Sequence, residues 1–273
     1  MKIDSHQHFW YYNPEEYRWV DEGMEALRKD YTPEDLAPLL SSIGFDGVIA
    51  VQARTTLEET EWLVSLARKY DIIKGVVGWV DLRAPDVEKV LDRFPDGSPL
   101  KGVRYKSDKI DDQLDRGIAA LSRRGLTYDL LMHPPDIPAA IGLVTRYPEQ
   151  RFVVDHIGRP VIRDRNMLPW RDDIRRLAKK GNVWCKLSGM VFEASWRRWK
   201  PGDFTPYIDV IYDAFGPDRL MIGSNWPVCL VAGDYKPVME IVIDYTRNLS
   251  SHAAEKILGD TCSRFYGVRG RDS

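Results

Sequence analysis

Short apolar segments recur along the whole chain, and each is bounded by polar or turn-forming residues. Their length and their content of Val, Ile and aromatic residues predict buried strands. Nearly continuous apolar strands of this kind are typical of parallel sheets that are covered on both faces. The segments span residues 3–8, 45–53, 72–80, 100–105, 127–133, 151–158, 182–189 and 219–226.

The stretches between these segments have the pattern of helices. Residues 56–70 carry apolar side chains at helical spacing and begin with Thr56 and Glu59, which are spaced as a capping box. The pair Thr32-Pro33 marks another helix start, because proline fits the first turn of a helix. Strands and helices are therefore expected to alternate along the chain.

Eight strand–helix units in about 250 residues are the content of a (β/α)8 TIM barrel. We expect such a barrel as one α/β domain over residues 1–273. A doubly wound open sheet is the alternative fold, but no Gly-x-Gly-x-x-Gly follows the first strand, so nothing indicates a dinucleotide-binding version. Residues 10–35 are expected to form a loop insertion after the first strand. Extra C-terminal helices are expected from about residue 234.

Charge and cysteine content narrow the class of protein. Lys and Arg number 39 against 41 Asp and Glu, a formal net charge of -2, which argues against nucleic acid or an anionic membrane as the main partner. No signal peptide or membrane span is expected, since no run approaches the ~20 apolar residues of a span. Cys185, Cys229 and Cys262 lie far apart and favour a reducing compartment. We therefore expect a cytoplasmic protein of unassigned oligomeric state.

The opening segment IDSHQHFW carries two histidines one residue apart. Side chains of a strand alternate between faces, so Asp4, His6 and His8 are expected on one side. An isolated His-x-His would suit a half-exposed strand equally well, but in such barrels the active site lies at the carboxyl ends of the strands. Unusual polar and aromatic residues gather at the other predicted strand ends, namely Gln52, Trp79, Asp81, Arg104, His133, His156, Lys186, Ser188 and Asn225.

These residues carry a resemblance to a known family. The motifs IDSHQHFW, KGVRY, FVVDHIGRP, VWCKLSGM and MIGSNWPV resemble those of the amidohydrolase superfamily in order and spacing. They are most similar to its lactonase branch, with sugar-lactone hydrolases of the L-fuconolactonase and L-rhamnonolactonase types and 2-pyrone-4,6-dicarboxylate lactonases. The resemblance runs from Ile3 to about Tyr266. It implies a hydrolase of carbohydrate catabolism that opens a sugar lactone, such as L-fucono- or L-rhamnono-lactone, to the aldonic acid.

Lactone opening requires an activated water, stabilisation of the carbonyl oxygen and a proton for the departing alkoxide. His6 and His8 could coordinate a divalent ion such as zinc, with His133 as a third ligand, or could donate hydrogen bonds to the carbonyl oxygen without metal. The resemblance implies an aspartate at the end of the eighth strand that deprotonates the water. This chain has Asn225 there, and an amide cannot usefully take a proton.

The identity of the general base therefore stays open. Asn225 could position the water while His156 or a metal-bound hydroxide supplies the basicity, or the chain could be an inactive variant. Without the carboxylate, zinc is expected to bind weakly or to be dispensable, because carboxylates supply the charge that cations favour. The predicted catalytic residues are His6, His8, His156 and Asn225.

Substrate binding is assigned to side chains at the same strand ends. Arg104 presents a planar charged fork to a carboxylate or to sugar hydroxyls, and Gln52 is a neutral hydrogen-bonding partner. Lys186 could steady the lactone oxygen or the product carboxylate, while Trp79 and Trp226 could stack on a sugar ring. A single conspicuous arginine favours a neutral sugar lactone over a dicarboxylate.

Two other classes of function remain open. One is a metal-dependent amidohydrolase or decarboxylase of the same superfamily, which would need tightly held zinc with an aspartate ligand. Asn225 counts against it. The other is a non-catalytic small-molecule binding protein that keeps the barrel after losing its base, and Asn225 is its main support.

Overall fold

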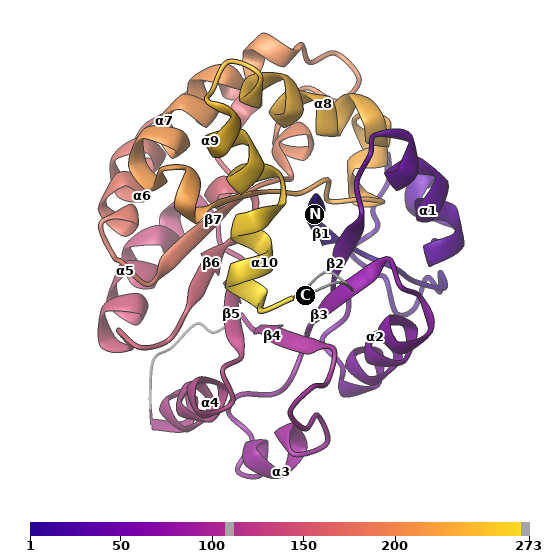
Figure 1. Cartoon of the computed structure of the whole chain (residues 1–273), viewed down its shortest axis with the longest axis vertical. Helices are drawn as coiled ribbons and strands as arrows, with labels where there is room; N and C mark the ends of the chain where they lie inside the picture. The colour runs from indigo at the N-terminus through magenta and orange to yellow at the C-terminus, as the bar shows by residue number, and fades with distance from the viewer. Residues whose placement is uncertain (107–111, 269–273) are drawn as a thin grey trace.

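The predicted strands form a ring of eight parallel strands. The structure is a computed structural model, and it describes residues 1–106 and 112–268. The strands follow one another in chain order, and a bridge between Gln7 and Trp226 joins the last to the first. They are β1 (Ile3–Gln7), β2 (Gly47–Val51), β3 (Ile73–Gly78), β4 (Leu100–Arg104), β5 (Thr127–Leu130), β6 (Phe152–Val154), β7 (Val183–Leu187) and β8 (Leu220–Ile222). The single-domain (β/α)8 barrel is confirmed, and the open sheet is not (Figure 1).

Helices lie around the outside of the ring (Figure 1). They are α1 (Pro33–Ser42), α2 (Leu57–Lys69), α3 (Val87–Leu91), α4 (Asp112–Arg123), α5 (Ile137–Arg146), α6 (Trp170–Ala178), α7 (Thr205–Phe215) and α8 (Tyr235–Thr246). The N-cap expected for α2 is present, since the Thr56 side chain accepts a hydrogen bond from the backbone N–H of Glu59. In the part of the chain that the structure describes, no helix combines the length and apolar character needed to cross a bilayer.

Short helical turns lie in the connections. They are η1 (Glu25–Leu27), η2 (Pro134–Asp136), η3 (Asp155–Gly158), η4 (Ile162–Asp164), η5 (Met190–Glu193), η6 (Pro201–Asp203), η7 (Pro217–Arg219), η8 (Val228–Val231) and the π-helical η9 (Lys256–Asp260). Four of them, η2, η3, η5 and η8, follow the strands β5, β6, β7 and β8. They therefore shape the carboxyl rim of the barrel.

The connection from β1 to α1 is a long loop that folds back on itself. Trp10 and Tyr31 exchange backbone hydrogen bonds of 2.9 and 2.8 Å, which hold the two ends of the loop together. An ion pair of 2.5 Å between Glu16 and Arg54 joins the loop to the β2–α2 connection. The loop thus lies beside the carboxyl ends of β1 and β2.

The C-terminal helices α9 (Ser251–Glu255) and α10 (Thr261–Tyr266) leave the outer ring, and α10 crosses the centre of the barrel (Figure 1). Cys262 and Phe265 of α10 form one buried apolar cluster with Ile3, Val153 and Met221 from the inside of the sheet. This cluster fills the amino-terminal end of the barrel. The site described below lies at the opposite end.

Candidate active site

A cavity of about 340 Å³ lies at the carboxyl ends of the strands. Five residues that the sequence predicts for the site line it, namely His8, Gln52, Arg104, His156 and Asn225. His8 and Asn225 are 217 positions apart in the chain but lie within hydrogen-bonding distance. The reason is geometric, because the carboxyl ends of all parallel strands of a barrel meet at one rim.

His8 and Asn225 determine each other's orientation. His8 Nδ1 lies 2.8 Å from the carbonyl oxygen of Val51, and Nε2 lies 3.2 Å from Asn225 Oδ1. Burial lowers the pKa of His8 to about 3, so the ring is neutral and carries one proton. Because a carbonyl oxygen only accepts, that proton is on Nδ1 and Nε2 needs a donor. The oxygen and nitrogen of a side-chain amide are assigned from the hydrogen bonds they make, so we assign the flipped orientation to Asn225, in which its amino group donates to His8 Nε2 and its oxygen is free to accept another hydrogen bond.

The backbone is strained where two of these side chains enter the cavity. His156 and Asn225 have φ of 56° and 58°, in the left-handed region that residues other than glycine rarely adopt. The Nδ1 atom of His156 lies 2.8 Å from Ser188 Oγ. Next to it, a Cβ atom on Gly189 would lie 2.5 Å from His156 Nδ1, so only glycine fits there. Strain of this kind persists at functional sites, where the surrounding structure imposes it.

A bulge in β1 gives His6 its direction. From Asp4 to Gln7 the strand advances three residues while β2 advances two. Asp4 accepts hydrogen bonds from the Ser224 backbone at 2.9 Å and from the Tyr235 hydroxyl of α8 at 3.2 Å, so it lies on the outer side of the sheet. The expectation that Asp4 shares a face with both histidines is wrong, because simple alternation fails at a bulge.

The His6 ring lies inside the barrel, directly beside the cavity. Its centroid is 5.0 Å from that of His8 and 4.4 Å from that of His156, and both of those rings line the cavity. His6 itself has no exposed surface, and its Nε2 atom is buried without a hydrogen-bond partner among the described residues. His6 thus lies against both of the other predicted catalytic histidines.

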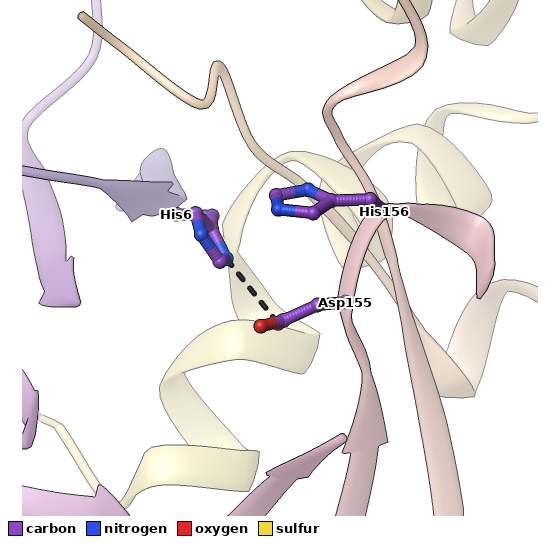
Figure 2. A group of neighbouring side chains, drawn as sticks. All are labelled: His6, Asp155 and His156. Atoms are coloured by element: carbon purple, nitrogen blue, oxygen red, sulfur yellow. Dashed lines mark ion pairs between the residues drawn. The ribbon is translucent and has the colours of Figure 1, made fainter. Parts of the chain in front are cut away.

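His6 belongs to a buried cluster of charged groups, part of which is shown in Figure 2. His6 Nδ1 lies 3.2 Å from Asp155 Oδ1 and 3.2 Å from the Lys186 ammonium. That ammonium lies 3.0 Å from Asp155 Oδ1 and 2.5 Å from Asp129 Oδ2, and Arg104 Nη1 lies 3.3 Å from Asp155 Oδ2. Two carboxylates thus balance two cations, which makes burial of all four tolerable.

The protonation of this cluster follows from burial and from the neighbouring charges. Burial raises the pKa of Asp129 to about 6, although Lys186 opposes the change. Burial would also raise the pKa of Asp155, but Lys186, His6 and Arg104 together outweigh burial, and the pKa lies well below its usual value. Burial lowers the pKa of His6 and of His156 well below the ordinary histidine value. At neutral pH the imidazoles are neutral, and Asp155 is ionised.

Four other residues that the sequence predicts for the site lie outside the cavity lining, as far as the described residues show. Trp226 is buried against Tyr31, with ring centroids 5.0 Å apart. Trp79 stacks on Tyr105 at 6.2 Å, and Lys186 is buried below the cavity in the charged cluster. His133 is exposed at the rim, with Nε2 3.1 Å from Arg159 Nη1.

Sequence reasoning missed several residues of the site. Trp19, Phe192, Arg159 and Glu193 line the cavity, and Arg159 Nε lies 2.7 Å from Glu193 Oε1. Trp19 stands in a loop without any periodic pattern, so no local signal points to it. Asp129 and Asp155 did carry a signal, since a carboxylate within an apolar strand segment needs a buried partner.

Three side chains come close enough to share a metal ion. His6, Asp155 and His156 offer ligand atoms that all lie within 4.8 Å of one another. However, the Lys186 ammonium already contacts His6 Nδ1 and Asp155 Oδ1, and Arg104 contacts the other oxygen of Asp155. A divalent ion on these atoms would stand beside two fixed positive charges. The donors therefore do not fit a tightly bound divalent ion.

Histidines, an arginine and an amide around a cavity at the carboxyl rim place this protein in the class of barrel enzymes that act on small molecules. Within that class the chain belongs to the amidohydrolase family, whose sequence model matches residues 3–268. The family resemblance of the strand motifs is thereby confirmed.

Individual relatives are similar over nearly the whole chain. An L-fucono-1,5-lactonase of Burkholderia multivorans is 38% identical over 98% of this chain and 96% of its own. An L-fucono-1,5-lactonase of Burkholderia ambifaria is 33% identical, again over 98% and 96%. The crystal structure of an amidohydrolase from Burkholderia multivorans with bound zinc has a TM-score of 0.94 and 37% identity, covering 98% of this chain and 100% of that chain.

Proposed function

We propose that the protein is a hydrolase that opens a sugar lactone to the aldonic acid, with L-fucono-1,5-lactone as the first candidate substrate. The two lactonase relatives, each aligned over 98% of the chain, support this proposal. The observation that carries it is the cavity, where neutral His8 and His156 meet Asn225 and Arg104. Its volume of about 340 Å³ suits a ligand the size of one sugar ring.

We assign proton transfer to His156 and water positioning to Asn225. The His156 ring lines the cavity, is held by Ser188, and is neutral because burial lowers its pKa. It can therefore accept a proton from an attacking water. The amide oxygen of Asn225 is free once its amino group binds His8, and it can hold that water. With these two roles, His156 serves as the general base in place of the missing carboxylate.

We assign charge stabilisation at the carbonyl oxygen to Arg104. Its Nη1 and Nη2 atoms are held by Asp155 and by the carbonyl oxygen of Gln52, and its Nε is buried without a partner among the described residues. A guanidinium fixed in this way is a preorganised donor to an oxygen that gains negative charge. The Gln52 side chain, which also lines the cavity, is assigned to a sugar hydroxyl.

We propose that a divalent metal ion such as zinc binds weakly here or is dispensable. If an ion were bound, His6, Asp155 and His156 would be its ligands by distance, and it would polarise the carbonyl group. The ammonium of Lys186 beside the same atoms supports weak binding. We also propose a cytoplasmic location, which rests on the wide spacing of the three cysteines.

The test is a panel of aldonolactones with a pH indicator that follows release of acid. The panel compares 1,5-lactones with 1,4-lactones, and L-fucono- and L-rhamnono-lactones with other stereoisomers, each corrected for spontaneous hydrolysis. We expect the highest kcat/KM for a neutral 1,5-lactone. Lactone binding without turnover would instead identify a binding protein, and zinc-dependent loss of CO2 from an aromatic acid would identify a decarboxylase.

A further inference from the structure

Two charged residues form one side of the cavity at its outer end. Arg159 follows η3 and Glu193 ends η5, and both side chains line the cavity. Arg159 Nε donates a hydrogen bond of 2.7 Å to Glu193 Oε1, and Arg159 Nη1 lies 3.1 Å from Nε2 of His133 at the exposed rim. Arg159 and Glu193 keep partial exposure, whereas His8 and His156 are buried. The ion pair therefore lies farther out than the histidines of the cavity.

The ion pair fixes the Glu193 carboxylate through one of its two oxygens. Arg159 itself is held in place, since its guanidinium lies 5.7 Å from the centre of the Phe192 ring. Arg159 also has a φ of 52°, so the backbone strain at His156 extends to this residue. Within residues 1–106 and 112–268, Glu193 Oε2 has no hydrogen-bond partner, and it is not fully buried. This oxygen is therefore open to a ligand in the cavity.

The pair leaves no cation of the cavity without a carboxylate beside it. Among the described residues that line the cavity, the cations are Arg104 and Arg159. Arg104 Nη1 lies 3.3 Å from Asp155 Oδ2, and Arg159 is paired with Glu193. A carboxylate on the outer end of a ligand would be repelled by Glu193 and would find no uncompensated cation there. A hydroxyl group would instead donate to Glu193, and a hydrogen bond to an ionised acceptor is about twice as strong as a neutral one.

Resting on the proposed function, we propose that Glu193 is a specificity-determining residue of the cavity. Its Oε2 accepts a hydrogen bond from a hydroxyl group at the end of the lactone away from the carbonyl, and its charge excludes lactones that carry a carboxylate there. The carbonyl end is assigned to His156 and Arg104, so the far end of one sugar ring reaches the ion pair in a cavity of about 340 Å³. Trp19 and Phe192 line the same cavity and offer apolar faces to the C–H groups of the ring.

The variant Glu193→Gln removes the charge and keeps the shape of the side chain. Glutamine retains an oxygen that accepts from Arg159 Nε, but Arg159 then has no carboxylate beside it. The variant should bind a neutral lactone more weakly, because one charge-assisted hydrogen bond is lost. It should bind a lactone with a second carboxylate more tightly, because the guanidinium of Arg159 becomes available to that group. A purely structural role of Glu193 would weaken the binding of both ligands.

The first test uses L-fucono-1,5-lactone as the substrate and a lactone of galactaric acid with the same sugar configuration as the competing inhibitor. The inhibitor carries a carboxylate where the substrate has a methyl group. For Glu193→Gln we expect KM of the substrate to rise about tenfold, the scale of one hydrogen bond to a charged group, with kcat within about twofold. The inhibition constant of the galactaric lactone should fall about tenfold, for the same reason.

Asp115→Asn is the matched control. It removes a carboxylate that pairs with an arginine, Arg146, between the outer helices α4 and α5. The control should leave KM and the inhibition constant unchanged. A Glu193→Gln variant with both constants unchanged, or with both ligands weakened alike, would overturn the proposal. A fall in kcat with KM unchanged would also overturn it, because Glu193 would then act in the reaction itself.

The second test needs no turnover. Isothermal titration calorimetry measures the dissociation constants of L-fuconate and of galactarate for the parent protein and for Glu193→Gln. We expect the variant to bind L-fuconate about tenfold more weakly and galactarate about tenfold more tightly. If no lactone reacts, the proposed function fails, while the calorimetry still decides the role of Glu193. The same ratio of the two dissociation constants in parent and variant, or no binding of either acid, would overturn the proposal.

Discussion

At the scale of the residue, Asn225 is matched to a neutral His8. The ring of His8 donates from Nδ1 to Val51, so its Nε2 requires a donor, and the side-chain amide of Asn225 in its flipped orientation supplies the amino group. A carboxylate at position 225 could only accept, and it would face the lone pair of His8. The amide is therefore the partner that this histidine requires, rather than a simple loss of the aspartate that the resemblance implies.

Asn225→Asp tests this match. We expect the pKa of His8 to rise from about 3, because a carboxylate stabilises the protonated ring, and kcat/KM at pH 7 to fall at least about tenfold. An NMR titration of His8 and steady-state kinetics measure the two effects. Higher turnover with a new pKa on the acidic limb would contradict the account and show that Asn225 replaced a lost base.

The sequence predicted those site residues that a strand positions directly. Five of them stand at the end of a strand or within three residues after it, and the rim of the barrel brings these together whatever the loops do, namely His8, Gln52, Arg104, His156 and Asn225. The same reasoning could not tell which tryptophans line the cavity and which are buried in the core. Trp226 turns into a buried aromatic cluster while Trp19 reaches the cavity, because the folding of the loop determines the side chain's direction.

At the scale of the element, the connection between β2 and α2 depends on one buried carboxylate. Glu59, in the first turn of α2, accepts hydrogen bonds from the backbone N–H groups of Ala53 and Arg54 at 3.0 and 2.7 Å. Ala53 lines the cavity, so this carboxylate fixes a wall of the site. Burial raises the pKa of Glu59 to about 7.

Glu59→Gln is expected to stabilise the fold at high pH. The pKa of Glu59 is higher in the folded state than the value of 4.5 that we take for the unfolded chain. Ionisation of Glu59 therefore lowers the free energy of unfolding progressively from about pH 4.5, and the loss is complete above about pH 7. Glutamine keeps an acceptor for both N–H groups without the charge. Urea unfolding should show a gain of up to about 3 kcal/mol at pH 8 and almost none at pH 4. An equal gain at both pH values would be the contradicting result.

The strands illustrate what the apolar pattern could not reveal. Continuous apolar segments predicted eight parallel strands, and the ring contains them. The bulge in β1 left no trace in that pattern, since Asp4, Ser5, His6 and Gln7 are all buried. The direction of each of these side chains depends on pairing with β2 and on partners such as Tyr235, which are remote in the chain.

At the scale of the whole molecule, the charge balance of the barrel interior determines the role of metal. Lys186 and Arg104 supply the positive charge that Asp129 and Asp155 require. We therefore expect that chelation with EDTA followed by gel filtration leaves lactonase activity within about twofold, with the metal content measured by mass spectrometry. Stoichiometric zinc that survives chelation, with activity lost only when it is stripped, would show that the metal is essential.

The most direct test of the account is the turnover of L-fucono-1,5-lactone by the parent protein and by His156→Gln. His156 is the proposed base, so the variant should lose at least about a hundredfold in kcat, and His6→Gln should show a loss of similar size. His252→Gln, a change at an exposed histidine in α9, serves as the control and should keep the parent rate. Hydrolysis by His156→Gln at the parent rate would contradict the account.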